Sequence, residues 1–456
     1  MVGWIRPCSV AHVAATVWLA LLALPVSGQV AVRNQGFVPF SNEPINYRAE
    51  VNDPVAQLQR RLDRGEATLS YEPAHGYLRD VLAQLSVPVS SQTLVFSKTS
   101  FQYRHISPKT PRALFFNDDV YVGQVQNGKV LEFVSFDPRQ GAIFYILDER
   151  KSATPTFERA ELDCTQCHVA AGTRGVPGVL IRSVFTNPTG TQATGAPAFI
   201  TGHQSPFTQR FGGWYVTGTH GAVTHLGNSL VQNREHPEAM DRSAGANVGD
   251  LSSRFDTSAY LTPHSDIVAQ VVQAHQTQMH NLITLTNYET RIALHQEAAA
   301  NRGSGRLPAT ISDVTRQRYE RPAEELVRYL LFVDEAPFEA PIRGSSGFAE
   351  EFSARGPRDL LGRSLRDFDL QARTFKYPCS YLVYSEAFDA LPEPAKSYVY
   401  RRLLDILTGR EQGPEFARLT AEDRQAIFEI LVATKPGLPE EWTNRRVMST
   451  RRGTIQ

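Results

Sequence analysis

The sequence predicts an α+β fold, with a β-rich N-terminal part, an irregular middle segment and a helical C-terminal part. Three observations support this. Residues 93–150 are rich in aromatic and β-branched residues separated by short turn sequences, residues 151–262 hold many glycines and prolines, and from residue 263 the apolar residues recur with helical spacing. Strands and helices that are segregated along the chain are typical of the α+β class.

The first 28 residues predict an export signal. Arg6 gives a positive start, residues 13–24 form an apolar stretch, and small residues precede a cleavage point after Gly28. This stretch is short for a membrane span, which needs about 20 residues. We therefore expect cleavage and a location in the periplasm or cell envelope. The alternative is an uncleaved membrane anchor, and only that case predicts membrane association.

Residues 29–92 are expected to be partly extended and then helical. One helix is predicted after Asp53-Pro54, and a second over residues 76–85. Residues 93–150 predict an antiparallel sheet, because the Asn127-Gly128 pair between two apolar runs is a strong hairpin signal.

Residues 151–262 are expected to be irregular, with a short helix that starts near Glu158. Residues 263–435 predict the helical part, and its longest helix lies between Pro263 and Gly303. A glycine-rich segment, residues 341–359, interrupts these helices, and residues 436–456 form a C-terminal tail. The other expected helices cover residues 313–333, 393–409, 414–418 and 421–433.

Charge and cysteine content narrow the function classes. The 456 residues carry 47 Lys and Arg against 47 Asp and Glu, so no global field favours a nucleic acid, and we expect no nucleic-acid partner. After cleavage three cysteines remain, too few for a disulfide framework. Cys379 lies among aromatic and apolar residues and is predicted to be a buried free thiol.

The strongest motif is Cys164-Thr165-Gln166-Cys167-His168. In a C-x-x-C-H motif the two thiols add to the two vinyl groups of a haem, and the histidine binds the iron as proximal ligand. One motif predicts one haem c, held by Cys164, Cys167 and His168. A thiol redox pair and half of a zinc site are the alternatives, and a zinc site would require further ligands.

A second iron ligand would be Met or His. His220 and His225 lie in a glycine-rich stretch that would let the backbone approach a flat macrocycle, with Trp214 and Tyr215 beside it. His275 and Met279 share one face of the long helix, whereas His280 points elsewhere. The other interpretation is that each of these residues is structural. His203, His264 and Met240 rank lower.

Several stretches resemble an uncharacterised family of large exported bacterial proteins with a single cytochrome c-type haem motif. This resemblance covers most of the mature chain, and it implies haem binding and a periplasmic location but no particular reaction. The matching pieces besides CTQCH are SSQTLVFSKTSFQ (90–102), PRALFFNDDVYVG (111–123), GVPGVLIRSVF (175–185), GGWYVTGTHG (212–221), TPHSDIVAQVVQAHQTQMHNLIT (262–284) and SSGFAEEF (345–352).

The sequence leaves three functions open. The first is electron transfer by a six-coordinate haem, with a redox partner protein. The second is a peroxidase- or oxidase-like haem enzyme with an open distal site, in which a histidine near Trp214 and Tyr215 acts as general acid–base. The third is a sensing or scaffolding module that uses the haem as a switch. An iron that binds external ligands would favour the second or third function.

Overall fold

The computed structural model describes Met1 and residues 37–443, except residues 306, 308 and 309. The chain divides into two compact units, Met1–Ala31 and Val32–Gln456, and all described helices and strands belong to the second. The predicted export signal beyond Met1, and the tail from residue 444 onward, lie outside the described residues.

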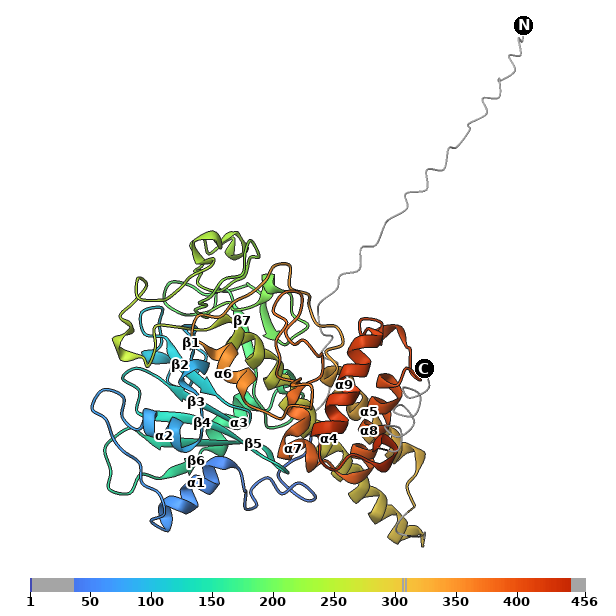
Figure 1. The fold of residues 1–456 in the computed structure, drawn as a ribbon. Coiled ribbons are helices and arrows are strands. Elements are labelled where there is room, and N and C mark those ends of the chain that lie inside the picture. The colour runs from blue at the N-terminus through green and yellow to red at the C-terminus, as the bar shows by residue number, and fades with distance from the viewer. Residues whose placement is uncertain (2–36, 306, 308–309, 444–456) are drawn as a thin grey trace. The chain divides into compact units, whose positions relative to one another are not determined.

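The predicted antiparallel sheet is confirmed. Six strands pair in chain order, each with the next, to form a meander (Figure 1). Asn127 has a φ of 58° in the connection between the third and fourth strands, where the hairpin is predicted. The strands are β1 (Thr93–Val95), β2 (Arg112–Phe116), β3 (Val120–Gln124), β4 (Val130–Asp137), β5 (Gly141–Asp148) and β6 (Phe157–Arg159).

The pairing register assigns alternate residues to two faces, because directly paired residues point to the same side of a sheet. One face carries the rows Phe116–Tyr121–Val134–Phe144 and Leu114–Gly123–Glu132–Ile146. The opposite face packs against helices α1 (Pro54–Asp63) and α2 (Leu78–Gln84) in a core that includes Phe115 and Phe133.

Helix α1 begins at a side-chain cap. The Asp53 carboxylate accepts hydrogen bonds from the backbone N–H groups of Val55 and Ala56, and its second oxygen accepts the hydroxyl of Tyr145 on β5, at 2.7 Å. Such a cap satisfies helix N–H groups that have no partner within the helix, and here it also ties α1 to the sheet.

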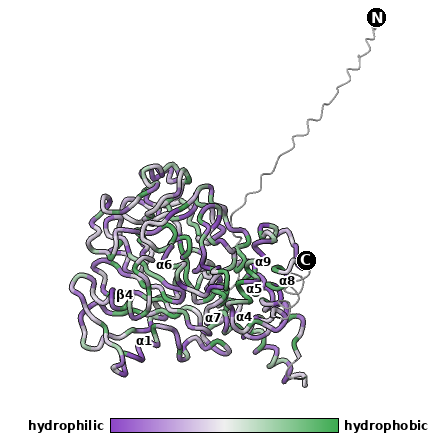
Figure 2. Tube along the Cα trace, viewed as in Figure 1, coloured by the Kyte–Doolittle hydropathy of each residue, from purple (hydrophilic) through white to green (hydrophobic). Residues whose placement is uncertain are grey.

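The long helix α4 (Ile267–Ser304) crosses the first face of the sheet. Asp266 caps its N-terminus and Gly305, with a φ of 69°, ends it, close to the predicted bounds. Hydrophobic segments gather where α4 meets the C-terminal helices (Figure 2). These helices are α5 (Asp313–Leu330), α6 (Phe348–Ala354), α7 (Glu386–Asp389), α8 (Glu393–Leu407) and α9 (Ala421–Thr434).

Two predictions in the helical part are wrong. Residues 414–418 contain only a 3-10 turn, Pro414–Phe416, because Gly413 and Pro414 precede a segment too short for a full helix. The glycine-rich segment 341–359 contains helix α6, since Phe348 and Phe352 are one helical turn apart and both are buried.

The middle segment is largely irregular, as predicted, and holds helix α3 (Glu161–His168) and the hairpin of β7 (Ile181–Val184) and β8 (Ala198–Thr201). Within the described part of the chain, no helix combines the length and apolar character needed to cross a bilayer.

Candidate functional site

Helix α3 carries the C-x-x-C-H motif directly after strand β6. Cys164, Cys167 and His168 are related as i, i+3 and i+4, so their side chains share one side of the helix. Cys164 is half-buried against the main core, whereas Cys167 is exposed. The motif therefore extends from the protein interior to its surface.

The His168 ring is oriented by its own loop. Its Nδ1 lies 2.9 Å from the carbonyl oxygen of Gly178, and a carbonyl can only accept, so Nδ1 carries the proton and Nε2 keeps its lone pair. Burial lowers the pKa of His168 below its usual value, which keeps the imidazole neutral. A donor bond from one ring nitrogen is the usual support of a metal-ligating histidine.

The segment that accepts this bond is held by helix α4. The Asn281 side chain accepts from the Val179 N–H at 3.1 Å and donates to the Val179 carbonyl at 2.7 Å. A Cβ added to Gly178 would lie 2.1 Å from Asn281 Oδ1, so only glycine fits there without a shift. Gln278, one turn earlier, donates to the carbonyl of Gly172. The imidazole position is thus tied to α4.

His168 lies on the same sheet face as α4 but over a different part of it. Its ring centroid is 5.0 Å from that of Phe144, while the α4 contacts fall on Tyr121 and Phe136, which pack against Gln276 and His280. We call the two parts the α4 half and the His168 half. The His168 half comprises Arg112, Leu114, Glu132, Val134, Phe144 and Ile146.

The burial of the two halves differs. Phe116, Tyr121, Phe136 and Ala142 of the α4 half are buried. In the His168 half, Phe144 is buried, whereas Leu114, Val134 and Ile146 are only half-buried although strands flank each of them. Apolar side chains in the middle of a sheet face are normally covered. The His168 half is therefore an apolar surface beside the motif that remains partly accessible.

An ion pair forms the polar end of the His168 half. The Nη2 of Arg112 contacts Glu132, which also accepts hydrogen bonds from Ser100 Oγ at 2.6 Å and Gln102 Nε2 at 2.8 Å. The Arg112 guanidinium lies against Gly123, where a Cβ would be 2.7 Å from Nη2. Glu132 lies on β4, next to β5 and its Phe144, so the pair is on the sheet face that packs against the imidazole.

The structure brings His220 and His225 together. Their Nε2 atoms are 3.2 Å apart. His220 also contacts the Val223 carbonyl through Nδ1 and accepts from the Asn247 N–H through Nε2, and His225 Nδ1 accepts from the Gly227 N–H. All four ring nitrogens thus have protein partners, and no hydrogen bond or ring contact joins either residue to His168.

His275 belongs to a different buried pair. His275 Nδ1 lies 2.9 Å from His203 Nδ1, and His203 Nε2 is 3.3 Å from the Val333 carbonyl. Since that carbonyl accepts, His203 is protonated on Nε2, His275 on Nδ1, and His275 Nε2 accepts the Ser380 hydroxyl at 2.8 Å. Met279, one turn further along α4, is fully buried in the main core.

The remaining candidates have structural partners. Met240 packs in a small separate cluster, and the backbone carbonyl of His264 accepts from Gln92. Trp214 donates to the Arg182 carbonyl and Tyr215 to the Pro108 carbonyl. As predicted, Cys379 is a buried free thiol, and burial raises its pKa to about 12.

Sequence reasoning missed three features: the Gly178–Asn281 contact, the His203–His275 pair and the Arg112–Glu132 pair. The last had a visible signal, because Arg112 begins an apolar strand and Glu132 lies within a largely apolar run of the next but one. The other two join residues about 70 to 100 positions apart, and no local pattern marks them.

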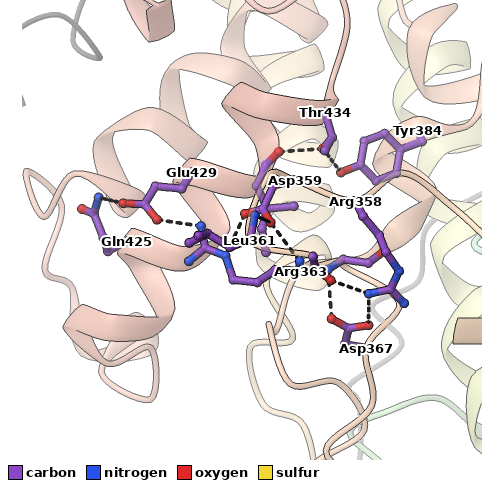
Figure 3. A network of polar contacts seen from close by, with 12 residues as sticks. Arg358, Asp359, Leu361, Arg363, Asp367, Tyr384, Gln425, Glu429 and Thr434 are labelled. Atoms are coloured by element: carbon purple, nitrogen blue, oxygen red, sulfur yellow. Dashed lines mark hydrogen bonds and ion pairs between the residues drawn. The ribbon is translucent and has the colours of Figure 1, made fainter. Parts of the chain in front are cut away.

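A cavity of about 640 Å³ lies between the 359–363 loop and helices α8 and α9. The Arg363 guanidinium joins Asp359 to Glu429, and Gln425 donates to the other oxygen of Glu429 (Figure 3). The polar side chains of this rim are thus engaged with one another. The loop presents Leu360 and Leu361, which are 93% and 74% exposed.

Comparisons with protein-family models, curated proteins and solved structures give no match. In the described ranges, no group of three or more His, Cys, Asp or Glu side chains is arranged to hold a metal ion. The chemistry of this chain is therefore argued from the α3 motif and its surroundings.

Proposed function

We propose that this chain is an exported protein of the periplasm or cell envelope that carries one covalent haem c and transfers electrons to or from a redox partner protein. Cys164 and Cys167 would hold the haem through thioether bonds, and His168 Nε2 would be the proximal iron ligand. The group would supply an iron that changes by one electron between its ferric and ferrous states.

The observation that carries this proposal is the His168–Gly178 hydrogen bond. This bond fixes the orientation of a neutral imidazole and leaves the lone pair on Nε2. The imidazole lies on the same side of helix α3 as both thiols. A thiol redox pair has no need of a histidine oriented in this way. The half-buried apolar side chains of Leu114, Val134 and Ile146 are also suited to contact a macrocycle.

The exposure of the motif favours electron transfer. Gln166 and Cys167 are exposed, so the edge of a group bound through Cys167 would lie at the surface, where a partner protein can approach. A buried thioether edge would instead favour chemistry inside a closed pocket.

The test is expression of the full chain with a c-type haem assembly system, followed by a denaturing gel stained for haem. We expect stain at the mass of the mature chain. We expect the Cys164→Ala/Cys167→Ala variant to lose it and the Cys379→Ala variant, as matched control, to keep it. Wild-type protein without covalent haem would refute the proposal.

A haem enzyme is the second candidate, and one observation favours it. His220, His225 and His275 use both ring nitrogens in protein contacts, and Met279 is enclosed in the core. Ligation by any of them requires these contacts to break. The carbon monoxide difference spectrum of the reduced protein separates the candidates, because ready binding indicates an open or labile distal site and no binding indicates a closed, six-coordinate iron.

A further inference from the structure

Arg112 occupies a distinctive position in the His168 half. It lies on β2, but its guanidinium reaches across Gly123 on β3 to Glu132 on β4, and β4 is the neighbour of β5, whose Phe144 packs against the imidazole. At about 4.8 Å per strand spacing, the guanidinium lies about 10 Å from β5 across the sheet. Arg112 therefore places a cation beside the imidazole on the same sheet face.

The hydrogen-bonding capacity of Arg112 is only partly used. An arginine has five N–H donors, and among the described residues only Nη2 has a polar partner, the Glu132 carboxylate. The buried Nε has no hydrogen-bond partner. The side chain is 19% exposed, so the guanidinium is within the reach of a bound group as well as of the sheet.

Glu132, in contrast, has polar partners on both carboxylate oxygens. It accepts from Ser100, Gln102 and Arg112, and Gln102 is itself fixed by the Val130 carbonyl and the Lys129 N–H. These bonds hold the carboxylate in one place, and the carboxylate holds the guanidinium across Gly123. Arg112 is thus a positioned cation beside an apolar surface, and this arrangement favours binding of a carboxylate or another oxyanion.

We propose that Arg112 is the anion-binding residue of this site, and that it binds either a haem propionate or a small anion that reaches the iron. This inference rests on the proposed haem function. Both sources share the same chemistry, a negatively charged group that accepts N–H hydrogen bonds from a guanidinium. Glu132 acts as a positioning residue that also offsets the charge of Arg112.

The test compares haem-loaded wild type with Arg112→Gln, Glu132→Gln and the control Arg150→Gln. Arg150 also pairs with a carboxylate of the sheet, Asp148, but at the exposed end of β5. We expect Arg112→Gln to lower the reduction potential and Glu132→Gln to raise it, because they remove charges of opposite sign. Arg150→Gln should leave it unchanged. A merely structural role would move both site variants in the same direction.

Two further measurements separate the sources. A shift of the haem propionate bands in the resonance Raman spectrum of Arg112→Gln, without a change in azide affinity, identifies a propionate. A loss of azide affinity for the ferric iron of about tenfold or more, with the propionate bands unchanged, identifies a small anion.

The outcomes also separate this inference from the haem proposal. Covalent haem in all four proteins, with the same potential, Raman bands and azide affinity throughout, would overturn the role of Arg112 and leave the haem proposal standing. A wild-type chain without covalent haem would overturn both. If Arg112→Gln fails to fold, Glu132→Gln decides, and an unchanged potential in that variant overturns the inference.

Discussion

Replacing Gly178 by alanine perturbs the contact that positions the His168 imidazole. The added Cβ would lie 2.1 Å from Asn281 Oδ1, so the 178–179 backbone or the asparagine must move. Gly178 does not adopt a positive φ, so the cost arises from overlap alone. Overpacking of this kind costs ~1–3 kcal/mol. The shift also lengthens the Nδ1–Gly178 hydrogen bond.

The partner substitution Asn281→Ala removes two buried hydrogen bonds instead. The N–H and C=O groups of Val179 each lose a side-chain partner, and each group left unsatisfied costs ~1–3 kcal/mol. We therefore expect a loss of ~2–5 kcal/mol in the free energy of unfolding. Asn287→Ala is the matched control on the same helix, since it removes a long bond to the Ala390 carbonyl and a long bond from Arg291 Nη1 but none to the His168 loop.

The double variant gives the decisive result. Without the asparagine amide, the tightest remaining contact of the alanine Cβ is Thr173 Cβ at 3.2 Å instead of an oxygen at 2.1 Å. Gly178→Ala should therefore cost less in the Asn281→Ala background than in the wild type. The double variant should lose ~1–3 kcal/mol less free energy of unfolding than the sum of the two single variants. Urea melts of the four proteins measure it. Additive effects would refute the argument that Asn281 fixes the loop holding His168.

Three further predictions concern titration and thiol access. The free energy of unfolding should fall as the pH drops below 6.5, because burial lowers the pKa of His203 to about 3 and that of His280 to about 4. Between pH 6.5 and 4 the unfolded chain binds more protons than the folded chain, so each histidine lowers the free energy of unfolding by ~1.4 kcal/mol per pH unit. Equal stability at pH 7 and pH 5 in urea melts would contradict this. Burial and the neighbouring Asp118 and Glu386 charges raise the pKa of Asp119 to about 7. The folded state therefore loses stability as the pH rises from 3.8 to 7. In the same assay, Asp119→Asn should raise the free energy of unfolding by ~1 kcal/mol at pH 8 and by less at pH 4.5. In a chain made without haem, a disulfide reagent should modify Cys167 at once and Cys379 only after unfolding, since the Cys379 thiol is fully buried. Rapid modification of the folded Cys164→Ala/Cys167→Ala variant would be inconsistent with that burial.

Features that depend on a local pattern could be predicted from the sequence. Hairpin signals and β-branched runs located strands β1 to β5, helical spacing and end signals located α4, and the motif placed Cys164, Cys167 and His168 on one short helix. These signals are local because strand and helix periods repeat within a few residues. Strand β6 (Phe157–Arg159) lies in the segment predicted to be irregular, with a helix from about Glu158. Where the local signal was weak, as in the segments that hold α6 and the 414–416 turn, the prediction was wrong.

Contacts between side chains from distant parts of the chain could not be predicted in this way. His275 pairs with His203, 72 positions away, whereas the sequence analysis grouped His275 with Met279. The partial exposure of Leu114 and the pairing of Arg112 with Glu132 across Gly123 follow from strand register and from where α4 crosses the sheet. The physical reason is that spacing along the chain sets the face on which a residue lies, whereas packing between distant elements sets what that face contacts.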